Sequence, residues 1–308
     1  MNPLGVPIGF AGGTNLNSIA EVRAEAQFAA EVGFDSFWVS QIFGVDPIVA
    51  LAAIAAECGS LSEVGTSVVP IYGRHPLTLA AQARTAQDVL GGRFTLGIGP
   101  SHAVVVEGFF GQSYDQPFTY TQEFIQALDP LLRGEPASVD GDEVTAHGAL
   151  NIEAEPVPIL LAAMGPKMLR LAGAHTAGTS LGAAVGPKTI ANHISPIINQ
   201  AATDAGRPAP RVKGFAVFAV TDKPEAARAA AIKGGAGYAS LPAYRAMLDR
   251  EGVDNGGELC LFGSIGEVVE GFQRYIDAGA TELRIGIGAP DEETEQRSRE
   301  AIAEWIAS

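Results

Sequence analysis

The segment Phe94-Thr-Leu-Gly-Ile-Gly-Pro-Ser-His102 (FTLGIGPSH) combines a short apolar run with two glycines, a proline and a histidine. Its first part is similar to the glycine-rich loops that bind dinucleotide phosphates. However, His102 stands where such a fingerprint has its third glycine, and Pro100 lacks the amide that would contact a pyrophosphate. The segment therefore predicts a buried strand over Phe94–Gly99, with His102 on the loop that follows it.

The same pattern recurs along the whole chain, where short runs rich in Val, Ile and Phe alternate with longer amphipathic stretches. The sequence predicts eight strands separated by helices, as parallel strands require. No linker divides the chain, so we expect one domain over residues 1–308 and a closed (β/α)8 TIM barrel rather than a doubly wound sheet. The expected strands are Val6–Phe10, Phe34–Ser40, Val64–Pro70, Phe94–Gly99, Pro158–Ala163, Gly178–Leu181, Lys213–Val220 and Leu283–Ile287.

Two stretches depart from this alternation. Arg133–Asn151 is polar and rich in turn residues, and it predicts an insertion with a small hairpin. Pro224–Arg250 is typical of a helical region, and its GGAG at Gly234–Gly237 predicts a break in the helix. In a TIM barrel the functional groups lie on the loops at the C-terminal ends of the strands, so we sought them there.

Composition disfavours several classes of function. The 308 residues are 47% hydrophobic and 18% charged, and their formal charge of −15 disfavours binding to nucleic acid or to anionic membrane surfaces. The sequence shows no signal peptide and no apolar run long enough to span a membrane, which indicates a cytoplasmic protein. Cys58 and Cys260 have no histidine at metal-ligand spacing, so we expect buried thiols and no metal site.

Two predicted strand ends carry residues suited to chemistry. The imidazole of His102 can titrate, donate or accept near neutral pH, although a loop histidine bonded to backbone explains it equally well. In VGTSVVPIYGRHP, Pro70 interrupts a β-branched run before Tyr72 and Gly73. This pattern fits either a strained bulge at the site or an ordinary loop with Arg74 and His75 at the surface.

An anion site is predicted after the strand at 158–163. Gly165 and Pro166 open a helix whose free amides, together with Lys167, suit a phosphate group, although a plain Gly-Pro helix start gives the same pattern. Gly182 and Gly186 follow the next strand, on the same side of the expected barrel.

The first two strand ends give weaker signals. Gln41 can bond the edge of a planar ring, whereas Trp38 is expected to pack against a helix. The small residues of GFAGG, at Gly9–Gly13, leave room above the barrel or form only a flexible loop.

Taken together, these segments resemble the bacterial luciferase-like superfamily, and within it the branch that uses the deazaflavin coenzyme F420. The resemblance covers nearly the whole chain and rests on the order and spacing of the segments. They are GFDSFWVSQ (33–41), VGTSVVPIYGRHP (64–76), GGRFTLGIGPSH (91–102), VEGFFG (106–111), PILLAAMGPKMLRLAG (158–173) and AGATELRI (278–285).

The resemblance implies a TIM barrel with an insertion that holds a deazaflavin or flavin ring in the barrel mouth. It implies a non-prolyl cis peptide bond at Ser67–Val68, in a bulge that backs the ring, and a phosphate tail over the turn that begins at Ala163. It also implies a homodimer. The expected cofactor-binding residues are Gln41, Ser67, Val68, Val69, Pro70, His102, Ala163, Met164, Gly165, Pro166, Lys167, Leu181 and Gly182.

The sequence also departs from the family. The F420-dependent sugar-phosphate dehydrogenases carry an Asp-His pair after the second strand and an acidic residue after the fourth, where this chain has Gln41-Ile42 and His102. A base that could take a proton from an alcohol is therefore absent at the Asp-His position, which disfavours sugar-phosphate oxidation. His102 is the expected catalytic residue, as a proton donor or as a group that stabilises negative charge. The small-molecule substrate is expected near Ala11, Gly12, Phe43 and the segment LPAYRAMLDREGV (241–253).

We therefore expect an F420-dependent oxidoreductase, acting as a reductase that moves a hydride between the deazaflavin and an activated double bond or related electrophile. An FMN-dependent luciferase-like monooxygenase is one alternative, and a non-catalytic F420-binding protein is another. A cofactor-free hydrolase would need a carboxylate or metal cluster at the strand ends, which the sequence does not indicate.

Overall fold

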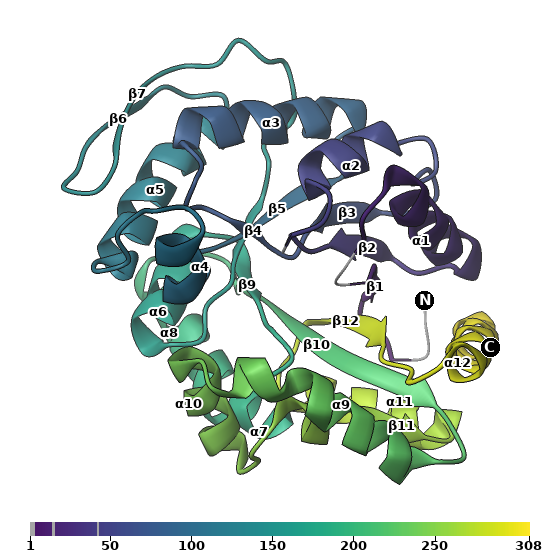
Figure 1. The fold of residues 1–308 in the computed structure, drawn as a ribbon. Coiled ribbons are helices and arrows are strands. Elements are labelled where there is room, and N and C mark those ends of the chain that lie inside the picture. The colour runs from purple at the N-terminus through teal and green to yellow at the C-terminus, as the bar shows by residue number, and fades with distance from the viewer. Residues whose placement is uncertain (1–3, 14–15, 42) are drawn as a thin grey trace.

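The computed structural model describes residues 4–13, 16–41 and 43–308, and within them eight parallel strands close into a ring. The ring closes where Arg211 pairs with Gly178, which joins the seventh strand to the sixth. The predicted (β/α)8 TIM barrel is confirmed, and Figure 1 shows the strands inside a layer of helices. The ring strands are β1 (Ile8–Ala11), β2 (Ser36–Val39), β3 (Glu63–Thr66), β5 (Phe94–Gly99), β8 (Ile159–Leu161), β9 (Gly178–Ser180), β10 (Arg211–Val220) and β12 (Glu282–Ile287).

Some helices begin at a residue whose side chain caps them. Ser18 accepts a hydrogen bond from the Glu21 amide, and Ser264 forms a capping box with Glu267. The helices are α1 (Ile19–Val32), α2 (Pro47–Ala53), α3 (Pro76–Val89), α4 (Ala103–Gly108), α5 (Pro117–Leu132), α6 (Pro166–His175), α7 (Pro187–Thr189), α8 (Ser195–Asp204), α9 (Pro224–Ala239), α10 (Pro242–Glu251), α11 (Ile265–Asp277) and α12 (Glu292–Ala307), with a π-helical turn η1 (Ile190–Ile194) and a 3-10 turn η2 (Gly256–Leu259).

Four further strands lie outside the ring. β6 (Ala137–Asp140) and β7 (Thr145–Gly148) form the hairpin predicted within the insertion, and it lies at the edge of the molecule near α3 and α5 (Figure 1). β4 (Val69–Pro70) pairs with the end of β5. β11 (Leu261–Gly263), which the sequence did not indicate, pairs with the end of β10.

The predicted helix break at Gly234–Gly237 is wrong, because α9 continues through these glycines to Ala239. Close packing of η2 explains one of them: a Cβ on Gly235 would lie 2.9 Å from Oδ1 of Asn255. On the η2 side, a Cβ on Gly257 would lie 2.4 Å from the Ile232 nitrogen. Gly235 and Gly257 therefore allow α9 and η2 to pack closely, and they do not mark the end of a helix.

Trp38 also differs from expectation, because it lies inside the barrel and not against a helix. Its ring fills space that glycines leave on both neighbouring strands: a Cβ on Gly9 would lie 2.7 Å from the indole nitrogen, and one on Gly65 would lie 2.4 Å from the ring. The indole N–H donates to the Ser36 hydroxyl at 2.8 Å, and Lys213 lies over the other face of the ring. At this level of the barrel interior, one large aromatic side chain thus packs between two glycines.

Candidate functional site

The predicted site residues gather at one end of the ring. Because all eight strands are parallel, their C-terminal ends meet at one opening, which we call the mouth; the opposite end, where the strands begin, we call the bottom. β1 ends at Ala11, and the loops after β2, β3, β5, β8 and β9 carry the other predicted residues. In chain order these are Gln41, Ser67–Pro70, His102, Ala163–Lys167 and Leu181–Gly182.

The loop after β3 forms the predicted bulge, and the Ser67–Val68 peptide bond is cis as expected. The glycines of FTLGIGPSH make room for it. A Cβ on Gly97 would lie 2.0 Å from the Thr66 carbonyl oxygen, and one on Gly99 would lie 3.1 Å from the Val68 side chain. These glycines therefore allow β5 to approach the bulge closely, which is the physical reason for the glycine pattern.

Arg284, on β12, holds the bulge from inside the barrel. Its Nη1 donates to the Ser67 carbonyl at 2.9 Å, and Ser40 Oγ donates to the same oxygen at 2.6 Å. The guanidinium lies over the Phe215 ring, 4.0 Å from its centroid. The Ser67 hydroxyl in turn lies 2.9 Å from the hydroxyl of Ser180 at the end of β9. Side chains from β12, from β9 and from the loop after β2 thus hold Ser67 at the mouth.

Arg284 is a functional candidate that the sequence reading did not single out. Its residue is 5% exposed, and its Nε has no hydrogen-bond partner among the described residues. Burial lowers the pKa of Arg284 to about 10, partly opposed by the nearby Tyr244, so the side chain is still cationic at neutral pH. The one signal in the sequence is an arginine within the otherwise apolar strand segment LRIGI.

His102 lies where the sequence predicted, between the end of β5 and α4. It is half-buried at the N-terminal cap position of α4, but its side chain makes no capping hydrogen bond. Burial lowers its pKa below the usual 6.5, so the imidazole is neutral at neutral pH. Its ring centroid is 5.4 Å from that of Tyr244 on α10, within the segment expected near the substrate.

Gln41 occupies the expected loop, but its side chain is already engaged. Arg74 donates to the Gln41 amide oxygen at 2.5 Å and forms an ion pair with Asp46 at 2.9 Å. Of the two alternatives for this segment, the ordinary loop with Arg74 and His75 at the surface does not hold for Arg74. Its side chain is only 13% exposed, because these two partners draw it inward. His75 caps α3, and Ile42 lies outside the described residues.

The turn after β8 has the features of an anion site. Gly165 is the N-cap of α6 and supplies no side chain to its free amides, and Lys167 is exposed beside them. The backbone of the turn is held from below, because His193 Nε2 lies 2.9 Å from the Met164 carbonyl oxygen and Thr179 Oγ1 contacts Ala163. Gly182 lies at the end of the adjacent strand, where a Cβ would approach Tyr244 to 3.6 Å.

A second Gly-Pro-Lys sequence shows what an occupied helix start looks like. At Gly186-Pro187-Lys188 the amides of Lys188 and Thr189 donate to the Glu251 carboxylate at 3.1 and 2.8 Å. Glu251 therefore takes the place of an external anion at α7. Among the described residues no side chain caps α6, so the amides at Gly165-Pro166-Lys167 can receive an anion, whereas those at Gly186-Pro187-Lys188 cannot.

The three predicted substrate residues have different surroundings. Ala11 is half-buried at the end of β1, whereas Gly12 is buried and packed, because a Cβ there would lie 3.0 Å from Leu16 and Phe37. Phe43 is 67% exposed, and its ring centroid is 5.1 Å from that of Phe109 beyond α4. Gly12 thus serves packing, while Phe43 lies at the rim of the mouth.

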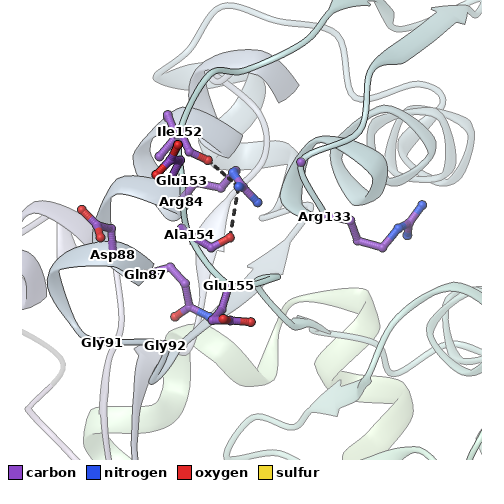
Figure 2. A pocket seen from close by; sticks show the side chains of 11 residues that line it. Arg84, Gln87, Asp88, Gly91, Gly92, Arg133, Ile152, Glu153, Ala154 and Glu155 are labelled. Carbon is purple, nitrogen blue, oxygen red and sulfur yellow. Dashed lines mark hydrogen bonds between the residues drawn. The ribbon is translucent and has the colours of Figure 1, made fainter.

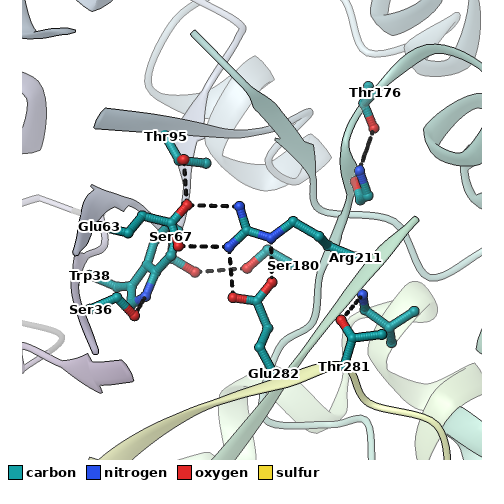
Figure 3. A network of polar contacts seen from close by, with 12 residues as sticks. Ser36, Trp38, Glu63, Ser67, Thr95, Thr176, Ser180, Arg211, Thr281 and Glu282 are labelled. Atoms are coloured by element: carbon teal, nitrogen blue, oxygen red, sulfur yellow. Dashed lines mark hydrogen bonds and ion pairs between the residues drawn. The ribbon is translucent and has the colours of Figure 1, made fainter. Parts of the chain in front are cut away.

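The bottom of the barrel carries a different kind of polar cluster (Figure 3). Arg211 donates to both carboxylates beside it, to Glu63 at 2.7 Å and to Glu282 at 2.6 Å. Burial raises the pKa of Glu63, but the hydrogen bond and charge of Arg211 outweigh it, so the net pKa is lowered. A cavity of about 400 Å³ opens beside this cluster, at the first residues of β3, β10 and β12.

Other kinds of site are less well supported. Within the described residues, no group of three or more His, Cys, Asp or Glu side chains could hold a metal ion. In the same part of the chain, no helix is both long and apolar enough to span a membrane. Cys58 and Cys260 are buried free thiols, and burial raises the pKa of each to about 11.

The structure is a TIM barrel whose candidate ligand site lies at the mouth, against the bulge that follows β3. The chain belongs to the luciferase-like monooxygenase family, whose model matches residues 5–282. It is 29% identical to the 5,10-methylenetetrahydromethanopterin reductase of Methanolobus tindarius over 250 residues, which are 80% of this chain and 76% of the reductase.

Two solved structures share the fold over nearly their whole length. One is the coenzyme F420-dependent tetrahydromethanopterin reductase of Methanopyrus kandleri, with a TM-score of 0.79, 21% identity and 98% of each chain covered. The other is an F420-dependent secondary alcohol dehydrogenase in complex with an F420-acetone adduct, with a TM-score of 0.83, 19% identity, and 100% of this chain and 99% of that chain covered.

Proposed function

We propose that this chain is a coenzyme F420-dependent oxidoreductase that transfers a hydride between the deazaflavin and a small organic substrate, and that it acts as a reductase. The observation that carries the proposal is the set of groups gathered at the mouth. The bulge at Ser67–Val68, the neutral imidazole of His102, the unpaired Nε of Arg284 and the uncapped start of α6 surround one opening. The reductase from Methanolobus tindarius and the two F420-dependent structures support the assignment.

The residues at the mouth fit this cofactor. Ser67, Val68, Val69 and Pro70 would back its ring, and Gly99 leaves room beside them, because a larger side chain there would contact Val68. The free amides of α6 and Lys167 would hold a negatively charged tail. The tail site is completed by the neighbouring residues Ala163, Met164, Gly165, Pro166, Leu181 and Gly182.

When bound, F420 would supply or accept the hydride, and the residues of the chain would orient the reactants and adjust the charge around them. His102 would donate its N–H to the atom of the substrate that gains negative charge, or pass it a proton. Gln41 cannot replace a base, because an amide does not titrate and its oxygen already accepts from Arg74. This arrangement favours reduction of an electrophile over oxidation of a sugar phosphate.

The alternative within the same family is an FMN-dependent monooxygenase, which the description of the family model favours. Fluorescence titration of the purified chain with F420 and with FMN separates the two. We expect F420 to bind in preference, and tight FMN binding without F420 binding would contradict the proposal.

Turnover distinguishes an enzyme from a protein that only binds F420. With reduced F420 present, the chain is expected to oxidise it in the presence of at least one member of a panel of enones, imines and nitro compounds. Tight F420 binding with no hydride transfer to any member would instead favour the binding protein. A homodimer, one catalytic domain over residues 1–308 and a cytoplasmic location stay predictions, and size-exclusion chromatography with light scattering tests the first.

A further inference from the structure

The contacts of Arg284 do not compensate its positive charge. Nη1 donates to the Ser67 carbonyl, and the guanidinium lies over Phe215, but Nε has no partner among the described residues. The residue is 5% exposed, so water does not replace the missing partner freely. A buried cation that makes one hydrogen bond to a neutral carbonyl has given up hydration without receiving a compensating charge.

The other interior charges do not compensate Arg284. At the bottom, both Glu63 and Glu282 are held by Arg211 through short hydrogen bonds. Across the described residues, Arg284 forms no ion pair with any carboxylate. Because side chains alternate along a strand, Glu282 and Arg284 lie on the same face of β12, and Arg284 is the one nearer the mouth.

Among the described residues of the mouth, the Asp46 carboxylate is already paired with Arg74, and Tyr244 on α10 is the titratable group that partly opposes the lowered pKa of Arg284. The Ser67 and Ser180 hydroxyls are neutral and bonded to each other, and His102 is neutral at neutral pH. Burial raises the pKa of the tyrosines Tyr72 and Tyr114, which lie in the loops beyond the bulge, so they are also neutral. The positive charge of Arg284 is therefore left for a ligand.

We propose that Arg284 supplies the positive charge that selects the anionic, reduced form of a planar ring cofactor at the mouth, so that the protein binds the reduced cofactor more tightly than the oxidised one. The inference rests on the proposed function and deepens it. A hydride carries two electrons and one proton, so a ring that accepts it gains one negative charge unless a further proton follows. A fixed cation beside the ring stabilises that charge.

Structural support of the bulge alone does not explain why Arg284 carries a charge. If Arg284 only supported the bulge, a neutral donor would serve the Ser67 carbonyl equally well, and the buried positive charge would have no purpose. In the mechanical case, substitution weakens both redox forms of the cofactor alike. In the electrostatic case, substitution weakens the reduced form selectively.

The test compares dissociation constants for oxidised and reduced F420, measured anaerobically by fluorescence and calorimetry, in wild type, Arg284→Gln and Arg284→Lys. Gln keeps a donor for the Ser67 carbonyl without the charge, and Lys keeps the charge. We expect Arg284→Gln to lose about tenfold or more in affinity for reduced F420 and about threefold or less for oxidised F420, in the range of a lost hydrogen bond to a charged group. The affinity ratio is the dissociation constant for oxidised F420 divided by that for reduced F420. A tenfold change in this ratio equals a shift of about 30 mV in the two-electron midpoint potential. Arg284→Lys should retain most of the ratio.

The matched control is Arg84→Met. Arg84 is 4% exposed and its Nε also lacks a partner among the described residues, but its guanidinium donates to the carbonyls of Ile152 and Ala154 on the outside of the barrel (Figure 2). It lines a surface cavity of about 670 Å³ away from the mouth. This control should lose stability in thermal unfolding while leaving the affinity ratio unchanged.

Several results would overturn the inference. An Arg284→Gln variant whose ratio equals that of Arg84→Met shows a mechanical role only. Wild type that binds both redox forms equally also refutes it, and this measurement needs no variant to fold. Wild type that binds neither form refutes the proposed function itself, so the two failures are distinguishable.

Discussion

The arginine at the bottom of the barrel and the arginine at its mouth have opposite surroundings. At the bottom, Arg211 lies between Glu63 and Glu282 and donates to both carboxylates, so its positive charge is shared by two negative charges. At the mouth, Arg284 contacts a carbonyl oxygen and an aromatic ring, and within the described residues it has no ion pair. The comparison indicates that the bottom serves stability and the mouth serves binding, as expected for this fold.

The largest expected effect comes from breaking the bottom cluster. Arg211→Met leaves Glu63 and Glu282 buried without their partner, and we expect the free energy of unfolding in urea to fall by about 3–5 kcal/mol. The control is Arg133→Met, because Arg133 also lies between two carboxylates, Asp129 and Glu135, but is 44% exposed and should cost at most about 1 kcal/mol. Equal losses in the two variants would contradict the comparison.

At the mouth, the corresponding effect is on catalysis. His102→Ala should lower kcat about 10²-fold with little change in thermal unfolding, because in the proposed function it removes the donor to the reacting atoms, and its side chain makes no capping hydrogen bond. Since burial holds the pKa of His102 below 6.5, the group does not titrate between pH 7 and 8, and its contribution to kcat should be constant there. His147→Ala, on the exposed hairpin beside Asp140, is the control. Unchanged turnover in His102→Ala would remove this residue from the mechanism.

Substitution of Lys213 tests whether this residue balances the charge of the carboxylates at the bottom. Its Nζ is buried without a hydrogen-bond partner among the described residues, so Lys213→Met should raise the free energy of unfolding by about 1–3 kcal/mol at pH 7. Burial holds the pKa of Lys213 well below 10.5, although Glu282 opposes the shift. The unfolded chain therefore binds more protons, and wild-type stability should gain from this group as pH rises from 7 to 10.

That gain should disappear in Lys213→Met, and urea unfolding at pH 7 and pH 9 measures it. Destabilisation by Lys213→Met at pH 7 would show instead that the ammonium is charged and balances the carboxylates.

The smallest expected effect separates the two Gly-Pro-Lys helix starts. Lys167→Ala should weaken F420 binding by about three- to tenfold, and more at low salt, because an exposed cation beside a free helix start contributes about 1 kcal/mol. Lys188→Ala should change affinity less than twofold, since Glu251 already occupies the start of α7. Equal losses would show that the uncapped amides of α6 do not define the tail site.

The sequence was sufficient for the architecture because strands and helices have local signals. The eight ring strands and the hairpin within Arg133–Asn151 were predicted from such signals, whereas the bulge after β3 was predicted from the family resemblance. Phe94–Gly99 matched the observed β5 to the residue, because its apolar run ends in a glycine and a proline.

Contacts between distant strands were beyond the sequence. Arg284 meets the Ser67 carbonyl across 217 positions of the chain, and no periodicity marks such a pair. Trp38 was assigned to the wrong side of its strand for the same reason: the glycines that receive it, Gly9 and Gly65, lie on neighbouring strands. The predicted break in α9 failed because local glycine rules do not include the close approach of η2.

The most direct test of the account is a crystal structure of this chain with F420 bound. We predict that the ring lies at the mouth against the Ser67–Val68 bulge, with His102 and Arg284 beside it and the phosphate at the start of α6. A cofactor bound at the bottom, beside Arg211, or bound at the mouth with its phosphate away from Gly165-Pro166-Lys167, would contradict the account.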